Sequence, residues 1–314
     1  MLSLVRAQVA DAVLSHAEPV IHAELIRLLG RPGYALHPEG RCRAGVLTLE
    51  VYAAIRRRYD RAALVAAAAV ELQMQSAYLF DDVADRPGAG SGPEDLALAL
   101  ALLTAGTATA TEATRDAPDP WSAMHHFCAA TGGACAGQFL DARLEKRGGA
   151  SLGEALEMTC LKSGSLGSFA AGFAARLAGA RGESLALFER VGFNLFTYAQ
   201  LVDDQRDACA PAGTCDLAQA KATLPVVYFS DRAAIDSARA VDGTIPRPTC
   251  DAYESSGASA YAAILALAYL DRAHADLAHL ADRGHDTHAL GRFLDRVESG
   301  ASETLGAVGG GVVA

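Results

Sequence analysis

Two apolar helical runs of this chain each end in three aspartates, and these two acidic helix ends constrain the fold more than any other feature. Both clusters have the spacing DDxxD, and their members are Asp81, Asp82, Asp85, Asp203, Asp204 and Asp207. The first and last aspartates of each cluster share one face of a helix with 3.6 residues per turn. Carboxylates at the carboxyl end of a helix repel one another and oppose the helix dipole unless a cation lies between them.

One acidic helix end is usually a solvated surface, so the interpretation rests on the pair. Mg²⁺ prefers carboxylates together with the phosphate oxygens of a substrate. The pair therefore predicts two oxygen-ligand clusters that face one cavity and hold Mg²⁺.

An all-α fold is predicted because helical periodicity recurs from end to end and β-branched runs are few. With 314 residues, of which 51% are hydrophobic, the chain can bury a large core. No internal boundary is visible in the sequence. We therefore expect one domain over residues 1–305, followed by a flexible tail over residues 306–314.

The net charge and the cysteine content limit which binding partners and which cellular compartment suit this chain. The formal net charge of −10 argues against nucleic acid or an anionic membrane, since both reward basic patches. Seven scattered cysteines without CxxC spacing favour a reducing, cytoplasmic compartment. The most apolar run, 62–80, carries Glu71, Gln73 and Gln75, which favours a helix buried in protein over a membrane span.

Glycine and proline interrupt the helical pattern at two informative places. The segment 86–94 follows the first aspartate cluster, and it is either a lid beside that cluster or a plain connector between two helices. Within the helical region 152–180, Gly164, Gly167 and Gly172 weaken a helix by about 1 kcal/mol each relative to alanine. We expect close packing or space for a ligand there.

Taken in order, the motifs resemble those of the trans-polyprenyl diphosphate synthase family over nearly the whole chain. The matching segments are GRCR at 40–43, the first DDxxD, GQxxD with Gln138 and Asp141, Lys162, Gln200 before the second DDxxD, and DLxxxKxTLP with Lys221. The resemblance implies the class I isoprenoid synthase fold, a single helical bundle around a central apolar cavity. It also implies a homodimer.

The resemblance assigns a role to each matching residue. It makes Asp81, Asp85 and Asp203 ligands of Mg²⁺, three ions in all, with Asp207 a further ligand and Asp82 and Asp204 beside them. The residues that would bind an allylic diphosphate are Arg43, Lys162, Gln200 and Lys221. Drawing charge off the diphosphate lets its C–O bond break, which leaves an allylic cation in an apolar pocket. Candidate pocket residues are Ala77, Tyr78, Phe80, Gln138, Phe169 and Phe196, and for each aromatic ring ordinary core packing is the alternative.

Departures from the family pattern fall on the segments that bind isopentenyl diphosphate, the second substrate. This chain has Gly40 where the family has the lysine of its GKxxR motif, and Met74 where the family has a histidine or glutamine. The RRG that follows the first cluster in the family is replaced by an uncharged segment that includes Gly90 and Ser91. The lysine-bearing loop after the second cluster shortens to residues 208–215. An anion without partners is costly to desolvate. We therefore expect a terpene cyclase that ionises one allylic diphosphate and cyclises its cation.

The small residues Ser76 and Ala77, at the place where bulky side chains shorten the product in this family, favour geranylgeranyl diphosphate as the substrate. Two other interpretations stay open. One is an elongating synthase, or a prenyltransferase that uses another acceptor. The other is a non-catalytic subunit that regulates a partner synthase, although such subunits tend to lose the aspartates that this chain retains.

Overall fold

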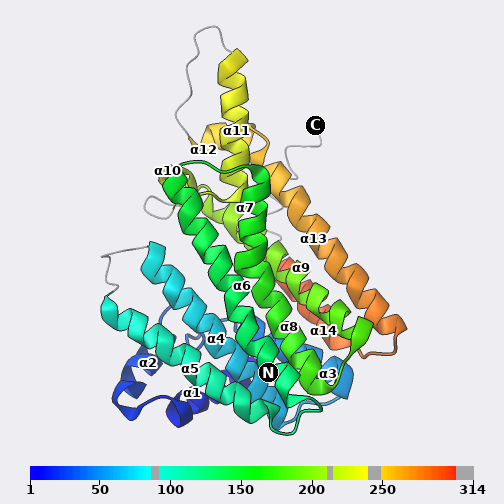
Figure 1. The fold of residues 1–314 in the computed structure, drawn as a ribbon. Helices are drawn as coiled ribbons and strands as arrows, with labels where there is room; N and C mark the ends of the chain where they lie inside the picture. The colour runs from blue at the N-terminus through cyan, green and yellow to red at the C-terminus, as the bar shows by residue number, and fades with distance from the viewer. Residues whose placement is uncertain (86–91, 211–214, 240–248, 302–314) are drawn as a thin grey trace. The chain divides into compact units, whose positions relative to one another are not determined.

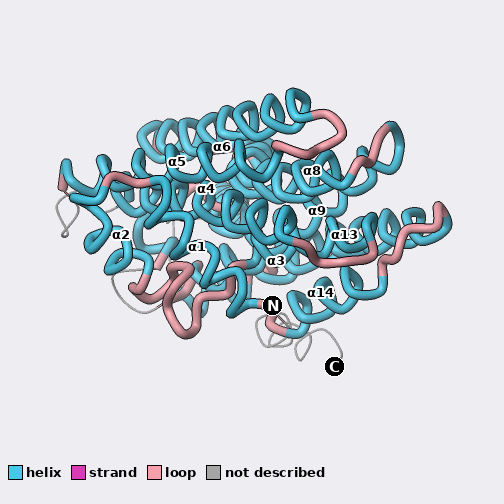
Figure 2. The backbone as a smooth tube through the Cα atoms, turned by 90° about the horizontal axis from the view of Figure 1, so that it is seen from below, coloured by secondary structure: helices cyan, strands magenta, loops and turns pink. Residues whose placement is uncertain are grey.

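The computed structural model describes residues 1–85, 92–210, 215–239 and 249–301, and every regular element in these ranges is a helix (Figures 1 and 2). The predicted all-α fold is therefore confirmed. The elements are α1 (Leu2–His16), the 3₁₀ turn η1 (Pro19–Ile21), α2 (His22–Leu29), α3 (Arg43–Arg56), α4 (Arg61–Asp85), α5 (Pro93–Thr114), α6 (Pro120–Arg147), α7 (Leu152–Thr159), the π-helix η2 (Cys160–Gly164), α8 (Ser165–Ala178), α9 (Gly182–Asp207), α10 (Asp216–Gln219), α11 (Leu224–Arg239), α12 (Cys250–Ser255), α13 (Ala258–Asp282) and α14 (His288–Ser299).

The chain forms two compact units, each described below by itself. Unit 1 comprises Met1–Gly132, Leu166–Gly192 and Asp276–Phe293. Unit 2 comprises Gly133–Ser165, Phe193–Ala275 and Leu294–Ala314. The first aspartate cluster belongs to unit 1 and the second to unit 2.

In unit 1, α4 is the central helix and packs against α5, α3 and α1 (Figure 1). Its alanine run 66–69 is fully buried, and small side chains let neighbouring helices approach closely. A Cβ at Gly106 of α5 would lie 3.2 Å from the carbonyl oxygen of Ala69. The close α4 and α5 packing fixes the direction in which α4 carries its terminal aspartates.

Glycines modify two helical stretches of the chain. The stretch 152–180 contains a π-helical turn at η2, and a Cβ at Gly164 would lie 2.5 Å from Thr197 Oγ1 of α9. This contact within unit 2 confirms the close packing expected for that glycine. The stretch 251–282 is divided between α12 and α13 at Gly257, whose φ of +81° favours glycine.

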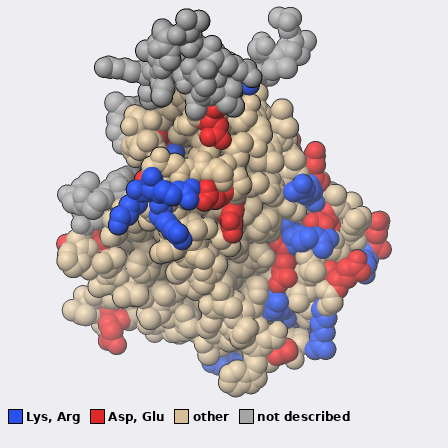
Figure 3. Space-filling view, turned by 45° about the horizontal axis from the view of Figure 1, so that its top comes forward, with Lys and Arg blue, Asp and Glu red and all other residues tan. Residues whose placement is uncertain are grey.

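In the parts of the chain that the structure describes, two helices, α4 and α5, are long and apolar enough to pass as membrane spans by length and composition. In α4, 78% of the apolar window is buried inside the protein, and in α5 the share is 44%. Core helices pass the same test, so this is weak evidence for a membrane. On the face shown in Figure 3, basic and acidic side chains lie beside one another over a largely uncharged surface.

Candidate active site

The first aspartate cluster stands at the end of α4 and is held by a tyrosine from a distant part of the chain. Asp81 and Asp82 are half-buried, and Tyr34 Oη donates a hydrogen bond of 2.7 Å to Asp82 Oδ2. Burial, followed by Asp82 itself, raises the pKa of Tyr34 well above its usual value, so the hydroxyl remains a donor at neutral pH. The side chain of Asp85 and the expected lid residues 86–91 lie outside the described residues.

The segment 30–42, which carries Tyr34, is anchored to α4 through two buried polar side chains. The amide of Ala35 donates to Gln75 Oε1 at 3.0 Å, and Gln75 Nε2 donates to Glu71 Oε1 at 3.0 Å. The other carboxylate oxygen of Glu71 accepts from the amide of Gly45 at 2.8 Å. Burial raises the pKa of Glu71 to about 7. Two of the polar residues that argued against a membrane span, Glu71 and Gln75, thus build the support for Tyr34.

Two of the positions that depart from the family pattern, Gly40 and Met74, are tightly packed, whereas Gly90, Ser91 and residues 211–214 lie outside the described residues. A Cβ at Gly40 would lie 2.3 Å from the carbonyl oxygen of Tyr34, so this backbone leaves no room for a lysine side chain. Met74 is 2% exposed and lies in the core of unit 1. The arginines beside Gly40 differ, because Arg41 is exposed while Arg43 is half-buried at the start of α3.

The second cluster, at the end of α9 in unit 2, contains a deeply buried carboxylate. Asp204 is 5% exposed, and its Oδ1 accepts a hydrogen bond of 2.7 Å from Gln200 Nε2. No side chain or backbone group of the described residues donates to its buried Oδ2. Burial raises the pKa of Asp204 to about 7. Asp203 is half-buried and paired with Arg206 at 2.7 Å, while Asp207 is exposed.

Both lysines implied in diphosphate binding are paired with acids within unit 2. Lys162 Nζ donates to Asp141 Oδ2 at 2.7 Å. Lys162 lies in η2, and the backbone of η2 lies very close to α6. A Cβ at Gly137 of α6 would lie only 2.3 Å from the amide nitrogen of Lys162. Lys221 Nζ lies 3.6 Å from Glu145 Oε1.

Asp216, the first residue of α10, belongs to the same charged group. Burial raises its pKa to about 6, with Lys221 opposing the shift and Asp207 adding to it. The sequence motif DLxxxKxTLP contained Asp216 without assigning it a role. Tyr34 was missed because nothing in its spacing connects it to Asp82.

The carboxylates of the two helix ends fit a divalent cation, which the structure does not contain. Asp204 Oδ2 is a buried acceptor for which the described residues supply no donor. A nearby cation would satisfy this oxygen and favour the charged carboxylate. Oxygen-rich sets of this kind suit Mg²⁺. Within each unit, the residues that would hold the ion are Asp81 and Asp82 in unit 1, and Asp203, Asp204 and Asp207 in unit 2.

The expected pocket residues differ in burial. In unit 1, Ala77 and Phe80 are half-buried and Tyr78 is 44% exposed. Phe169 is packed into an aromatic core, with its ring centroid 5.1 Å from that of Phe127, so core packing accounts for it. In unit 2, Gln138 is half-buried and Phe196 is buried.

This helical architecture, with acidic clusters closing two long helices, is the isoprenoid synthase fold. The model of the family described as polyprenyl synthetase matches residues 28–254, so the chain belongs to the polyprenyl synthetase family. No curated protein matches the chain. Many solved structures do, and they establish the fold at identities below 25%.

Three of these structures illustrate the likeness. A geranylgeranyl pyrophosphate synthetase from the archaeon Geoglobus acetivorans has a TM-score of 0.75 and 22% identity, covering 97% of this chain and 95% of its own. A polyprenyl synthase from Caulobacter crescentus, complexed with calcium and isoprenyl diphosphate, has a TM-score of 0.74 and 21% identity, covering 96% and 93%. A decaprenyl diphosphate synthase from Rhodobacter capsulatus has a TM-score of 0.72 and 18% identity, covering 98% and 95%.

The expected family and fold are thus confirmed. These three neighbours are named as prenyl synthases and not as cyclases. The comparisons therefore favour the alternative of chain elongation over the cyclase that the sequence departures led us to expect.

Proposed function

We propose that this protein is a metal-dependent prenyl diphosphate synthase, which ionises an allylic prenyl diphosphate with release of diphosphate and joins the resulting cation to isopentenyl diphosphate with loss of a proton. Family membership supports this proposal, as do the names of the structural neighbours. The observation that carries it is the buried carboxylate of Asp204, which Gln200 orients and for which the described residues supply no second donor. Such a group is costly to bury unless a cation joins it.

In the proposed mechanism, bound Mg²⁺ supplies positive charge that stabilises the departing diphosphate. Gln200 holds one oxygen of Asp204, and the other oxygen would be available to bind the metal ion. Lys162, fixed by Asp141, adds a further positive charge near the second cluster. In unit 1, Tyr34 orients Asp82 by its hydrogen bond. Binding of three Mg²⁺ ions is part of this proposal.

Terpene cyclisation is a second candidate, and one observation favours it. The close approach of Tyr34 O to Gly40 excludes a lysine at the position where elongating relatives place a cation for the second diphosphate. Met74 adds no hydrogen-bonding group and is buried. A cation without an incoming acceptor reacts with the double bonds of its own chain, and geranylgeranyl diphosphate is the substrate proposed for this reaction.

One experiment separates the candidates. The purified protein is incubated with Mg²⁺ and geranyl, farnesyl or geranylgeranyl diphosphate, each with and without isopentenyl diphosphate. Hexane extracts and dephosphorylated products are analysed by mass spectrometry. Longer prenyl alcohols that require isopentenyl diphosphate support elongation, whereas hydrocarbon formed from one allylic diphosphate alone rejects elongation and supports cyclisation.

We also propose a homodimer, to be tested by light scattering during gel filtration. The non-catalytic alternative makes a different prediction for Asp81→Ala. If the purified wild-type protein and this variant have the same activity, or neither has any with Mg²⁺ and every substrate pair, catalysis at the first cluster is rejected.

A further inference from the structure

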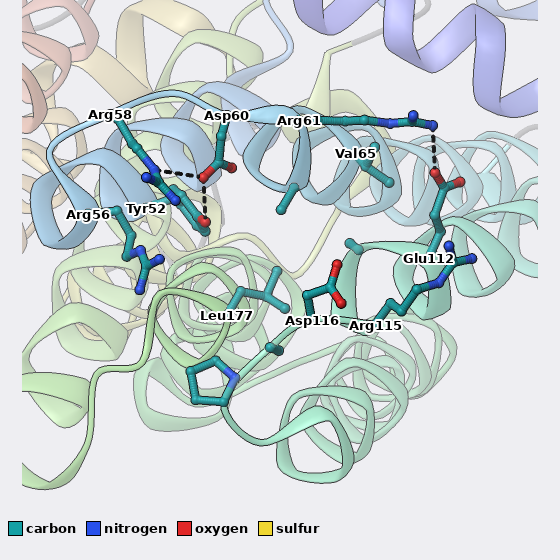
Figure 4. A pocket seen from close by; sticks show the side chains of 14 residues that line it. Tyr52, Arg56, Arg58, Asp60, Arg61, Val65, Glu112, Arg115, Asp116 and Leu177 are labelled. Carbon is teal, nitrogen blue, oxygen red and sulfur yellow. Dashed lines mark hydrogen bonds and ion pairs between the residues drawn. The ribbon is translucent and has the colours of Figure 1, made fainter.

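Unit 1 contains a cavity far from its aspartates (Figure 4). Its volume is about 480 Å³, within the range of ordinary small-molecule sites. The walls come from the end of α3, the connection to α4, the first turns of α4, the end of α5, the connection to α6 and the end of α8. Arg61 at its edge and Asp81 stand near opposite ends of α4, about 30 Å apart at 1.5 Å per residue. The cavity is therefore separate from the first aspartate cluster.

Four arginines line this cavity, in a chain whose formal net charge is −10. Three come from the stretch RRRYDR at 56–61, and the set is Arg56, Arg58, Arg61 and Arg115. In Figure 4, Arg56 and Arg58 stand on one side and Arg61 and Arg115 on the other, with Leu177 and Asp116 between them. Guanidinium groups on facing walls are suited to an anion held between them.

Two of the lining carboxylates are already engaged by the protein. Asp60 accepts from Tyr52 Oη at 3.0 Å, from Arg58 Nε at 3.1 Å and from the amide of Ala63 at 3.1 Å. These contacts make it the cap of α4, and its pKa is lowered despite partial burial because these donors favour the charged form.

Glu112 is engaged in the same way. It accepts from Arg61 at 2.9 Å and lies 3.6 Å from His16 Nε2. The engaged carboxylates account for Arg58 and Arg61 and leave little affinity for a metal ion. They do not account for the other two arginines.

The guanidinium groups of Arg56 and Arg115 have no ion pair or hydrogen bond with any residue that the structure describes. Their positions at the ends of α3 and α5 suit the helix dipoles, but that effect is small for exposed side chains. Besides Asp60 and Glu112, the cavity lining contains one further acidic residue, Asp116, for these two guanidinium groups. The floor is apolar, with Val65 and Leu177 both buried. The cavity thus offers positive charge at its rim and hydrocarbon contact below.

We propose that this cavity binds the phosphate or diphosphate group of a small organic anion, with Arg56 and Arg115 as the principal cationic contacts. A ligand with a hydrocarbon portion places that portion on Val65 and Leu177. The site is independent of the metal-dependent reaction because none of its lining residues belongs to either aspartate cluster. Free diphosphate and prenyl diphosphates share the recognised chemistry, and the experiment distinguishes them.

The test is isothermal titration calorimetry of the full chain with inorganic diphosphate in the presence of EDTA, which removes metal-bridged binding. The double variant Arg56→Gln/Arg115→Gln is compared with Arg27→Gln/Arg283→Gln, which removes two exposed arginines outside the cavity. We expect the dissociation constant to rise at least tenfold in the first variant and to stay at the wild-type value in the second. Circular dichroism melting curves confirm that both variants are folded.

Repeating the titration with geranylgeranyl diphosphate identifies the source of the anion. A wild-type affinity above that for inorganic diphosphate, which the double variant loses, assigns the cavity to a ligand with a hydrocarbon tail. An equal loss for both ligands assigns it to the diphosphate group alone. The proposal is overturned if the wild-type protein binds neither ligand in EDTA, or if the double variant binds both as tightly as the wild type.

Discussion

Tyr34 Oη donates a hydrogen bond of 2.7 Å to Asp82 Oδ2, which connects the loop before α3 to the acidic end of α4. The loop has its own anchor on α4, through the amide of Ala35 and Gln75. Because the segment that carries Tyr34 is anchored to α4, its hydroxyl limits the orientations that the Asp82 carboxylate can adopt. This geometry identifies Tyr34 as a positioning residue for the first cluster.

Tyr34→Phe is expected to lower both stability and turnover. Loss of a hydrogen bond to a charged group costs about 1.5 kcal/mol of stability. Release of the Asp82 carboxylate is expected to reduce kcat/KM about tenfold, equivalent to about 1.4 kcal/mol. Urea unfolding and steady-state kinetics measure the two effects. Tyr59→Phe is the matched control, because Tyr59 donates at 2.8 Å to Glu50, away from the cluster; an equal loss of activity in both variants contradicts the positioning role.

Asp204→Asn is expected to abolish stabilisation by metal and diphosphate. A ligand that binds the folded state raises its melting temperature by mass action, and loss of a metal-ligating carboxylate weakens such binding about 100-fold. Melting curves with and without Mg²⁺ and inorganic diphosphate provide the measurement. Asp271→Asn, at an exposed position of α13, serves as the control. If Mg²⁺ and diphosphate raise the melting temperature of the Asp204 variant as much as that of the wild type, this carboxylate does not hold the metal.

Much of the fold was predictable because its signals are local. The helix bounds of α4 and the break at Pro19 follow from apolar periodicity and proline geometry. Both aspartate clusters were predictable from spacing, since DDxxD repeats at two apolar helix ends. The π-helical turn at η2 was not, because it depends on how closely α9 packs against Gly164.

The supports of the site were less accessible from sequence. Tyr34 and Asp82 are joined by a contact of long sequence separation, and no short motif records it. Lys162 was assigned to phosphate by resemblance, whereas its ion pair with Asp141 depends on the approach of η2 to α6. A spacing pattern reports which residues share a face, but it does not report which neighbouring element supplies a partner.

Stability in the absence of metal is expected to decrease as the pH rises to about 7. Burial raises the pKa of Glu71 to about 7, so the folded state keeps a proton that the unfolded state has already lost. Where the folded state binds more protons, the free energy of unfolding falls with pH, by up to about 1.4 kcal/mol per pH unit for each such group. Asp204, with its pKa also raised to about 7 by burial, contributes in the same direction.

Urea unfolding between pH 5 and pH 8 in EDTA tests this dependence. Glu71→Gln is expected to flatten the slope, and to cost about 1 kcal/mol at pH 5 because the side-chain NH₂ of glutamine cannot accept the hydrogen bond that the second carboxyl oxygen accepts. Glu39→Gln makes the same charge change at an exposed position and keeps the wild-type slope. A Glu71 variant as steep as the wild type would assign the dependence to other groups.

Two glycines of α6 are expected to respond oppositely to substitution by alanine. A Cβ at Gly137 would lie 2.3 Å from the amide nitrogen of Lys162, whereas nothing lies within 4 Å of one at Gly132. Gly137→Ala forces η2 away from α6, and overpacking of this kind costs about 1–3 kcal/mol. Gly132→Ala gains about 0.5–1 kcal/mol of helix propensity. Thermal unfolding measures both. Because η2 carries Lys162, the Gly137 variant is also expected to have a lower kcat than the wild type at temperatures where both proteins are fully folded. A wild-type kcat under those conditions would show that the position of η2 does not matter for the reaction.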